Sequence, residues 1–101
     1  MIDRELLELA AKAAGFLAPL DYDNNAGLLF KNGDGYWNPL TDDGDALRLA
    51  VKLRIDLLHA FDTRTAMAEN TSGYAAEGPD PYAATRRAIV RAAAEIGREM
   101  K

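Results

Sequence analysis

Hydrophobic and polar positions follow two different periods along this chain. Near the N-terminus, apolar residues recur every three or four positions: Leu6, Leu9, Ala10 and Ala13. This spacing is typical of one face of an amphipathic helix. It predicts a helix over residues 3–14, with Asp3 as its N-cap and Gly15 just beyond its end.

Two later stretches have the same helical period. The first covers residues 42–53, with Thr41 or Asp42 as its cap and further aspartates in its first turn, where the helix dipole favours negative charge. The second covers residues 81–99, because Asp80 can cap a helix there and a proline follows at the first helical position. The predicted buried face of this last helix carries Tyr82, Thr85, Ile89, Ala92, Ala93, Ile96 and Met100.

Strand-like patterns fill much of the remaining chain. Residues 27–38 hold two short apolar runs around Asn32-Gly33, a pair that favours the positive φ angles of a tight hairpin turn. Residues 54–69 alternate as a second hairpin would, although continuation of the preceding helix stays open because no Gly or Pro intervenes. The stretches 16–26 and 70–79 are rich in turn formers and are predicted as connections.

These elements predict an α+β fold in the order α-β-β-α-β-β-α, with an antiparallel sheet packed against helices. The 101 residues fit one small domain spanning 1–101, and a content of 49% hydrophobic and 28% charged residues is ordinary for a globular protein. No apolar run reaches the roughly 18 residues that a membrane span needs. The first residues also lack a secretory signal, so the cytosol is the expected compartment.

The scarcity of cysteine and histidine limits the catalytic and metal sites that the chain can form. The chain has no cysteine and one histidine, His59, so thiolate sites and His-rich zinc sites are excluded. His59 has no identifiable nucleophile or fixed carboxylate partner in the sequence, and we interpret it as structural. Asp42, Asp43 and Asp45 are interpreted as helix-capping acids rather than metal ligands. We therefore expect no catalytic residue, no metal and no cofactor.

The net charge of −4 conceals an asymmetry between the two parts of the chain. Residues 1–79 carry 13 acids and 7 bases, whereas residues 80–101 carry 3 acids and 5 bases. An acidic protein is a poor nucleic-acid binder, because basic side chains that neutralise phosphates supply most of that affinity. The charge balance fits either plain solubility or an acidic face offered to a basic partner.

Two groups of residues are candidates for binding. The ring of Trp37 can belong to the core, or it can join the amide of Asn38 in a platform for a small planar ligand such as a nucleotide. The second group is basic and lies on the last helix opposite its apolar face: Arg87, Arg91 and Arg98, with Arg86 at the boundary. This group is either a solvated face or a docking surface for an acidic protein or a nucleotide.

Two segments resemble a known group of proteins. Residues 36–49 read YWNPLTDDGDALRL, and residues 80–90 read DPYAATRRAIV. Their W-N-P-L-x-D-D box and A-T-R-R-A helix resemble small proteins of tailed phages and prophages of proteobacteria, namely the phage α/β/α-sandwich family and, more distantly, the NinX-like proteins. The resemblance implies an accessory phage protein that acts in the host cytoplasm, and it supplies no catalytic residues.

The leading hypothesis is a non-enzymatic phage or prophage accessory protein that binds a host protein, with components of antiviral defence among the expected targets. The alternative is a small-molecule binder that sequesters a nucleotide signal through Trp37, Asn38 and the arginines. An enzyme is the least favoured class. We expect neither nucleic acid nor a membrane as a partner, and homo-oligomer formation stays open.

Overall fold

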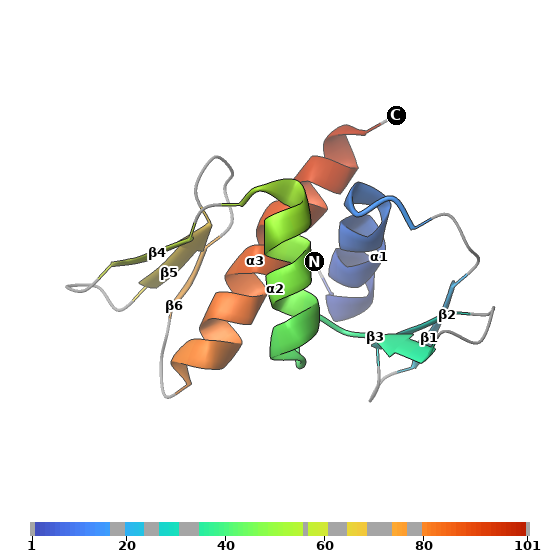
Figure 1. Cartoon of the computed structure of the whole chain (residues 1–101), viewed down its shortest axis with the longest axis horizontal. Helices are drawn as coiled ribbons and strands as arrows, with labels where there is room; N and C mark the ends of the chain where they lie inside the picture. Colours follow the sequence, from blue (N-terminus) through green and yellow to red (C-terminus); the bar gives the residue numbers. More distant parts are fainter. Residues whose placement is uncertain are drawn as a thin grey trace.

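The computed structural model of the chain describes residues 2–16, 20–23, 27–30, 35–55, 57–60, 65–68, 74–76 and 80–100. Within these ranges the elements, in chain order, are α1 (Asp3–Ala13), β1 (Leu20–Asp23), β2 (Gly27–Phe30), β3 (Gly35–Trp37), α2 (Asp43–Leu53), β4 (Leu57–Ala60), β5 (Thr65–Ala68), β6 (Tyr74–Ala76) and α3 (Pro81–Glu99). The helices lie side by side at the centre, and a small sheet lies on either side of them (Figure 1). This arrangement gives the molecule a long axis of 44 Å against 29 and 23 Å.

The strands form two separate antiparallel sheets, with the orders β1-β2-β3 and β4-β5-β6. Leu28 of β2 is the register partner of Trp37 in β3, and His59 of β4 is the partner of Ala66 in β5. The α+β class is confirmed, but the predicted order lacks two strands and the predicted single sheet is wrong. β1 lies within 16–26 and β6 within 70–79, the two stretches predicted as connections.

The additional strands follow from the direction of the helices. Asp3 contacts Arg87, and the ammonium of Lys12 lies 2.9 Å from the carbonyl oxygen of Met100, so α1 and α3 run parallel. Asp43 at the start of α2 likewise contacts Arg86 near the start of α3. A connection of two antiparallel strands returns the chain to the end that it left, whereas three strands deliver it to the opposite end. β1 and β6 therefore let each new helix begin at the same end as the last one.

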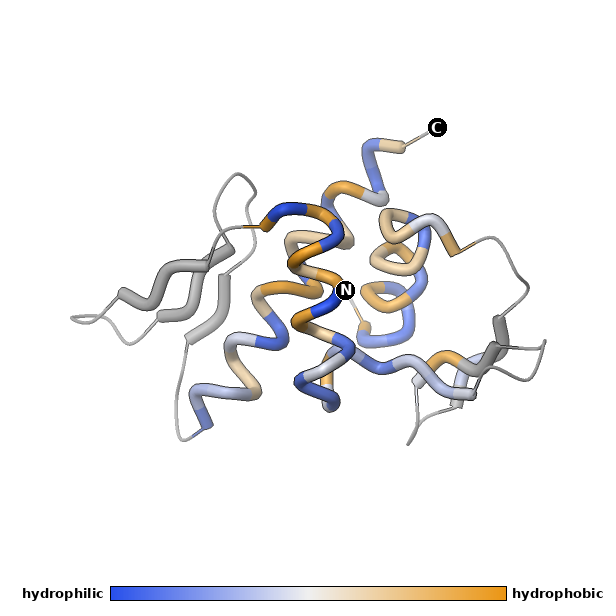
Figure 2. Tube along the Cα trace, viewed as in Figure 1, coloured by the Kyte–Doolittle hydropathy of each residue, from blue (hydrophilic) through white to orange (hydrophobic). Residues whose placement is uncertain are grey.

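The core lies mainly between the helices, and alanine supplies a large share of it. Buried residues from all three helices include Leu6, Leu7, Ala10, Ala46, Leu49, Ile89, Val90 and Ala93. Figure 2 shows apolar and polar positions alternating along each helix. α1 and α3 approach so closely that a side chain at Gly97 would collide with the carbonyl oxygen of Leu9. The alanines therefore allow close contact between the helices.

α3 is buried on several sides rather than along one stripe. It contacts α1, α2 and the sheet strands β5 and β6. The prediction that Ile89 is buried is confirmed, but Tyr82 and Met100, placed on the same face, are 70% and 42% exposed. Val90 is fully buried although the pattern left it out. A single amphipathic stripe fails here because a central helix has neighbours around most of its circumference.

The helix ends depend on local hydrogen bonds. Asp42 caps α2 by accepting a bond of 2.7 Å from the backbone N–H of Asp45, and Asp80 caps α3 as predicted. The prediction for α1 is wrong, because Ile2 occupies the N-cap position without a side-chain bond and Asp3 is the first helical residue. Gly15 follows the end of α1 with a φ of +83°, as expected for a helix-terminating glycine.

The second hairpin is confirmed in its paired strands. α2 ends at Leu53, and Arg54 then adopts the left-handed conformation with φ 55° and ψ 46°. β4 and β5 pair antiparallel within the predicted 54–69 hairpin, so α2 does not continue there. β2 and β3 likewise pair within the predicted 27–38 hairpin. The predicted turn at Asn32-Gly33 lies outside the described residues, and so do residues 61–64 between β4 and β5.

Candidate functional site

The structure assigns Trp37 to the core, as one of the two sequence interpretations had it. Its side chain is 6% exposed, and its ring meets the ring of Phe16 edge to face, with centroids 5.0 Å apart and planes at 90°. This T-shaped geometry is a favourable arrangement for aromatic pairs. The indole therefore joins β3 to the segment that follows α1.

The side chain of Asn38 holds a turn. Its Oδ1 accepts a hydrogen bond of 3.1 Å from the N–H of Leu40, and its own N–H donates to Oδ2 of Asp45 over 3.0 Å. Its carbonyl oxygen accepts from the N–H groups of Thr41 and Asp42. The W-N-P-L-x-D-D box is thus a turn followed by a helix cap, and the amide oxygen of Asn38 has a backbone partner.

Arg86 and Arg87 are neighbours in sequence that reach two different helices. Nη1 of Arg86 donates to Oδ1 of Asp43 over 2.6 Å, and its Nε donates to the carbonyl oxygen of Leu40 over 2.9 Å. Nη1 of Arg87 donates to Oδ1 of Asp3 over 3.2 Å. The side chain of Arg86 is 16% exposed, so most of it is removed from solvent. Together the two guanidinium groups tie α3 to the first turns of α2 and α1.

The predicted basic stripe is therefore not one outer face. Arg87 is half-buried against α1, which corrects its assignment to the side opposite the core. Arg91 is exposed, and Arg98 pairs with Glu95 at 3.3 Å. The arginines do not share one face because α1 and α2 both pack on the side of α3 that carries Arg86 and Arg87.

The two motifs of the resemblance meet in space. Leu40 and Asp43 belong to the W-N-P-L-x-D-D box, and both contact Arg86 from the A-T-R-R-A helix. Distinctive residues at 36–49 and 80–90 thus form one joint between α2 and α3. Sequence reasoning had treated the two motifs as separate candidate surfaces.

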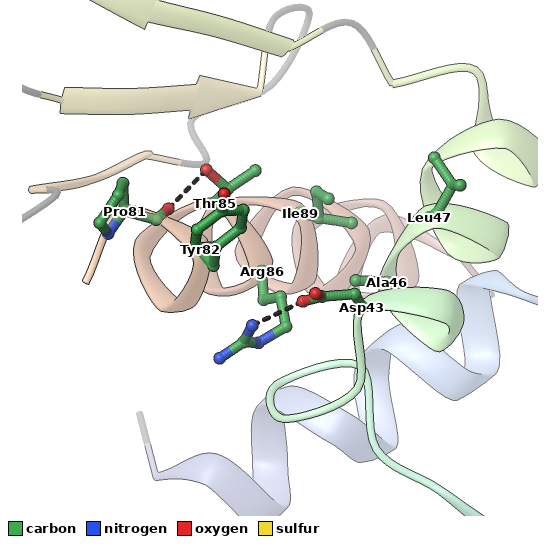
Figure 3. Close-up of a pocket in the computed structure, with 8 residues that line it drawn as sticks. All are labelled: Asp43, Ala46, Leu47, Pro81, Tyr82, Thr85, Arg86 and Ile89. Atoms are coloured by element: carbon green, nitrogen blue, oxygen red, sulfur yellow. Dashed lines mark hydrogen bonds and ion pairs between the residues drawn. The ribbon is translucent and has the colours of Figure 1, made fainter.

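A groove lies beside this joint, between α2 and α3 (Figure 3). Its volume is about 520 Å³, and the Arg86–Asp43 pair is part of its wall. The rest of the wall is mostly apolar: Ala46, Leu47, Pro81, Tyr82, Thr85 and Ile89. A concave apolar wall with one charged pair has the make-up of a binding site.

Large apolar side chains stand exposed on the wall of this groove, at Leu47 and Tyr82, and one turn beyond it on α2, at Val51. Leu47 is 62% exposed and Tyr82 is 70% exposed, and Val51, one turn beyond Leu47 on α2, is 68% exposed. The helical pattern of residues 42–53 did not indicate this surface, because Leu47 and Val51 adjoin the buried stripe of Ala46, Leu49 and Ala50. The available signal was the second pair of apolar residues at i, i+4 on α2, which exceeds what one buried face requires. Clustered exposed apolar residues mark interaction surfaces.

A second hollow lies against another face of α2. Its volume is about 360 Å³, and it has an aromatic floor from Phe16 and Trp37. Arg48 and Lys52 of α2 also line it. The ammonium of Lys52 lies 5.8 Å from the centroid of the Phe16 ring, within the range of a cation–π interaction.

The remaining candidate residues lie on strands. His59 lies on β4, and its side chain is outside what the structure describes. Asp21 and Asp23 both lie on β1. Among the described residues, no three His, Asp or Glu side chains gather where they could hold a metal ion. No helix in the described part has the length and apolarity to span a membrane.

The chain was compared with protein-family models, with curated protein sequences and with solved structures. None of the three comparisons gives a match.

Proposed function

We propose that this chain is a non-enzymatic binding protein whose α2–α3 groove receives an apolar segment of a partner protein. The observation that carries the proposal is the exposure of Leu47, Val51 and Tyr82 beside a groove of about 520 Å³. Exposing side chains of this size forgoes roughly 1.5–3 kcal/mol of burial each. A partner that covers them recovers that free energy.

The dimensions of the groove favour an amphipathic helix as the bound segment. α2 has 11 residues, which corresponds to a length of about 16 Å. Leu47 and Val51 are four residues apart and follow one line along that length. A partner helix that lies in such a groove is recognised through its apolar side chains at positions i, i+3, i+4 and i+7. Tyr82 adds the kind of aromatic anchor in which binding energy concentrates.

Charge favours a basic flank on the partner segment. The protein carries a net charge of −4, and the carboxylate of Asp43 at the groove is 71% exposed although it pairs with Arg86. Complementary charge speeds the encounter and disfavours wrong partners. The motif resemblance suggests that the chain is a phage or prophage accessory protein and that its partner is a host protein in the host cytoplasm. The process that we propose for this partner is host defence.

Binding is favoured over catalysis by what the charged groups already do. Asp42 and Asp80 cap helices, and Asp45 accepts bonds from Asn38 and Arg48. Arg86 and Arg87 join helices. Side chains that are committed to hydrogen bonds of the fold are poor candidates for general acid–base work, which needs a group free to exchange protons with a substrate.

The test is affinity capture from a lysate of proteobacterial host cells. The baits are the parent chain, the double variant Leu47→Gln with Val51→Gln, and the matched control Tyr36→Ser. Glutamine keeps helix propensity while removing apolar surface. Tyr36 is a 54% exposed aromatic residue on β3 and is not among the residues lining the groove.

We expect one host protein that the parent and Tyr36→Ser both retain and the double variant loses. Retention of the same proteins by all three baits, or capture of none by the parent, would overturn the proposal. A sedimentation measurement on the purified chain tests whether a second copy of the chain occupies the groove instead. If the parent dimerises and the double variant is a monomer, the groove is filled by a second copy and the host-partner proposal is wrong.

A further inference from the structure

We propose that the hollow between the end of α1 and α2 is a separate site for a small anion that carries a flat apolar ring. Two independent features of the hollow point to this class of ligand: an aromatic and aliphatic floor, and two cations at its wall. The site does not depend on the groove of the proposed function.

The floor supplies apolar and aromatic contact. Phe16 and Trp37 meet there at 90°, so their edges and faces are presented at right angles within one hollow. Ala14 and Leu49 complete the floor, and both are 2% exposed. The apolar surface that a flat ring can cover belongs mainly to Phe16, which is half-buried, because Ala14, Leu49 and Trp37 are almost fully buried. Displacing water from that ring is the usual source of affinity in small-molecule sites.

The cations come from one line along α2. Arg48 and Lys52 are four residues apart, so both project over the same hollow. Nη2 of Arg48 lies 2.7 Å from Oδ1 of Asp45, and the side chain of Arg48 is still 72% exposed. Within the described part of the chain, Lys52 forms no ion pair, and its ammonium lies over the Phe16 ring. An anionic group on the ligand can therefore meet Lys52 without first displacing a described carboxylate.

Size restricts the ligand to one ring system with one anionic group. The volume of about 360 Å³ is near the lower end of the roughly 300–1,000 Å³ typical of ligand pockets. A nucleoside monophosphate and an aromatic carboxylate share the required chemistry. Asn38, which the sequence had suggested as part of a nucleotide platform, is not among the residues lining the hollow.

The hollow and the groove occupy different sides of the same helix. An α-helix turns about 100° per residue, so Leu47 and Lys52 project about 140° apart. A ligand in the hollow therefore leaves the groove open. Variants in one site test that site alone.

The experiment uses the fact that the chain has one tryptophan. The indole N–H of Trp37 gives a single resonance in a ¹H–¹⁵N NMR spectrum, and it reports directly from the hollow. The probes are adenosine monophosphate, benzoate, adenosine and inorganic phosphate, each titrated into the full chain. The variant is Lys52→Gln, and the matched control is Lys12→Gln in the last turn of α1, where Lys12 bonds to the Met100 carbonyl oxygen outside the hollow.

We expect a saturable shift of the Trp37 resonance with adenosine monophosphate or benzoate. Adenosine should bind at least about tenfold more weakly than its monophosphate, and phosphate alone should leave the resonance in place. Lys52→Gln should weaken the anionic ring probes by about tenfold, and Lys12→Gln should not. No saturable shift with either anionic ring probe would overturn the proposal. An equal response to phosphate alone, or equal affinity in Lys52→Gln, would overturn it as well.

Discussion

Arg86 of α3 and Asp43 of α2 form an ion pair with 2.6 Å between Nη1 and Oδ1, although 43 residues separate them in the chain. The same guanidinium donates through Nε to the carbonyl oxygen of Leu40, just before α2 begins. One side chain therefore fixes both the turn that precedes α2 and the first residue of that helix. The groove lies against this joint, so its shape depends on Arg86.

Replacing Arg86 with methionine tests the joint. The Leu40 carbonyl and the Asp43 carboxylate lose their donor, and hydrogen bonds of charged groups contribute about 1.5–3 kcal/mol to stability. We expect the free energy of unfolding in urea to fall by about that amount. Arg98→Met is the control on the same helix, because the exposed i, i+3 pair with Glu95 is worth only about 0.3–0.5 kcal/mol. Equal losses in the two variants would show that Arg86 has no special role.

Replacing Asn38 with alanine separates its structural role from a ligand-binding role. The N–H of Leu40 loses its acceptor, so we expect a loss of stability of about 0.5–1.5 kcal/mol. Asn38→Asp keeps an oxygen in place and should lose less. Thermal unfolding measured by circular dichroism gives the order parent, Asn38→Asp, Asn38→Ala. If Asn38→Ala melts with the parent, the turn does not need the side chain.

Gly97→Ala tests the close approach of α1 and α3. The added methyl group collides with the backbone of Leu9, and backbone cannot move aside as a flexible side chain can. Overpacking of this kind costs about 1–3 kcal/mol, even though alanine favours helix over glycine by about 1 kcal/mol. The control is Gly44→Ala in the first turn of α2, where the nearest atoms belong to the ends of the Arg48 and Asp42 side chains. We expect Gly44→Ala to be neutral or stabilising, and a stable Gly97→Ala protein would contradict the packing described.

Arg54 tests how α2 ends. A residue other than glycine in the left-handed conformation carries a strain of roughly 1 kcal/mol, and Arg54 has a φ of 55°. Arg54→Gly should therefore raise the midpoint of chemical denaturation, because it increases the free energy of unfolding by up to about 1 kcal/mol. Arg54→Val should lower it, because a β-branched residue is least tolerated at positive φ. The reverse order in chemical denaturation would contradict the left-handed helix end.

The sequence was sufficient for the helices but not for the full number of strands. Helical spacing and the Asp42 and Asp80 caps are local signals, and these predictions are confirmed. β1 and β6 are short, of four and three residues, and carry several turn-forming or small residues, so their local preference for strand is weak. Their pairing with β2 and β5 decides the outcome, and the alternation of residues within such short strands does not show it.

The candidate site was even less accessible from the sequence. A helical wheel assigns one buried face to each helix, so it ranked Leu47 as the edge of a core and Arg87 as solvent-facing. The structure places Arg87 against Asp3 and leaves Leu47 exposed. Both outcomes depend on α3 being central, with α1 and α2 on either side of its arginine pair. That arrangement is a property of the tertiary fold.

The most direct test of the proposed groove docking is the dissociation constant of a protein that the parent chain captures, measured by calorimetry with purified components. The double variant Leu47→Gln with Val51→Gln and the control Tyr36→Ser should both unfold at the temperature of the parent, since all three side chains are exposed. Loss of anchor residues costs at least about 2 kcal/mol, which is roughly a thirtyfold weaker complex. We predict that loss for the double variant and unchanged affinity for Tyr36→Ser. Equal affinity of the parent and the folded double variant would contradict docking in the α2–α3 groove.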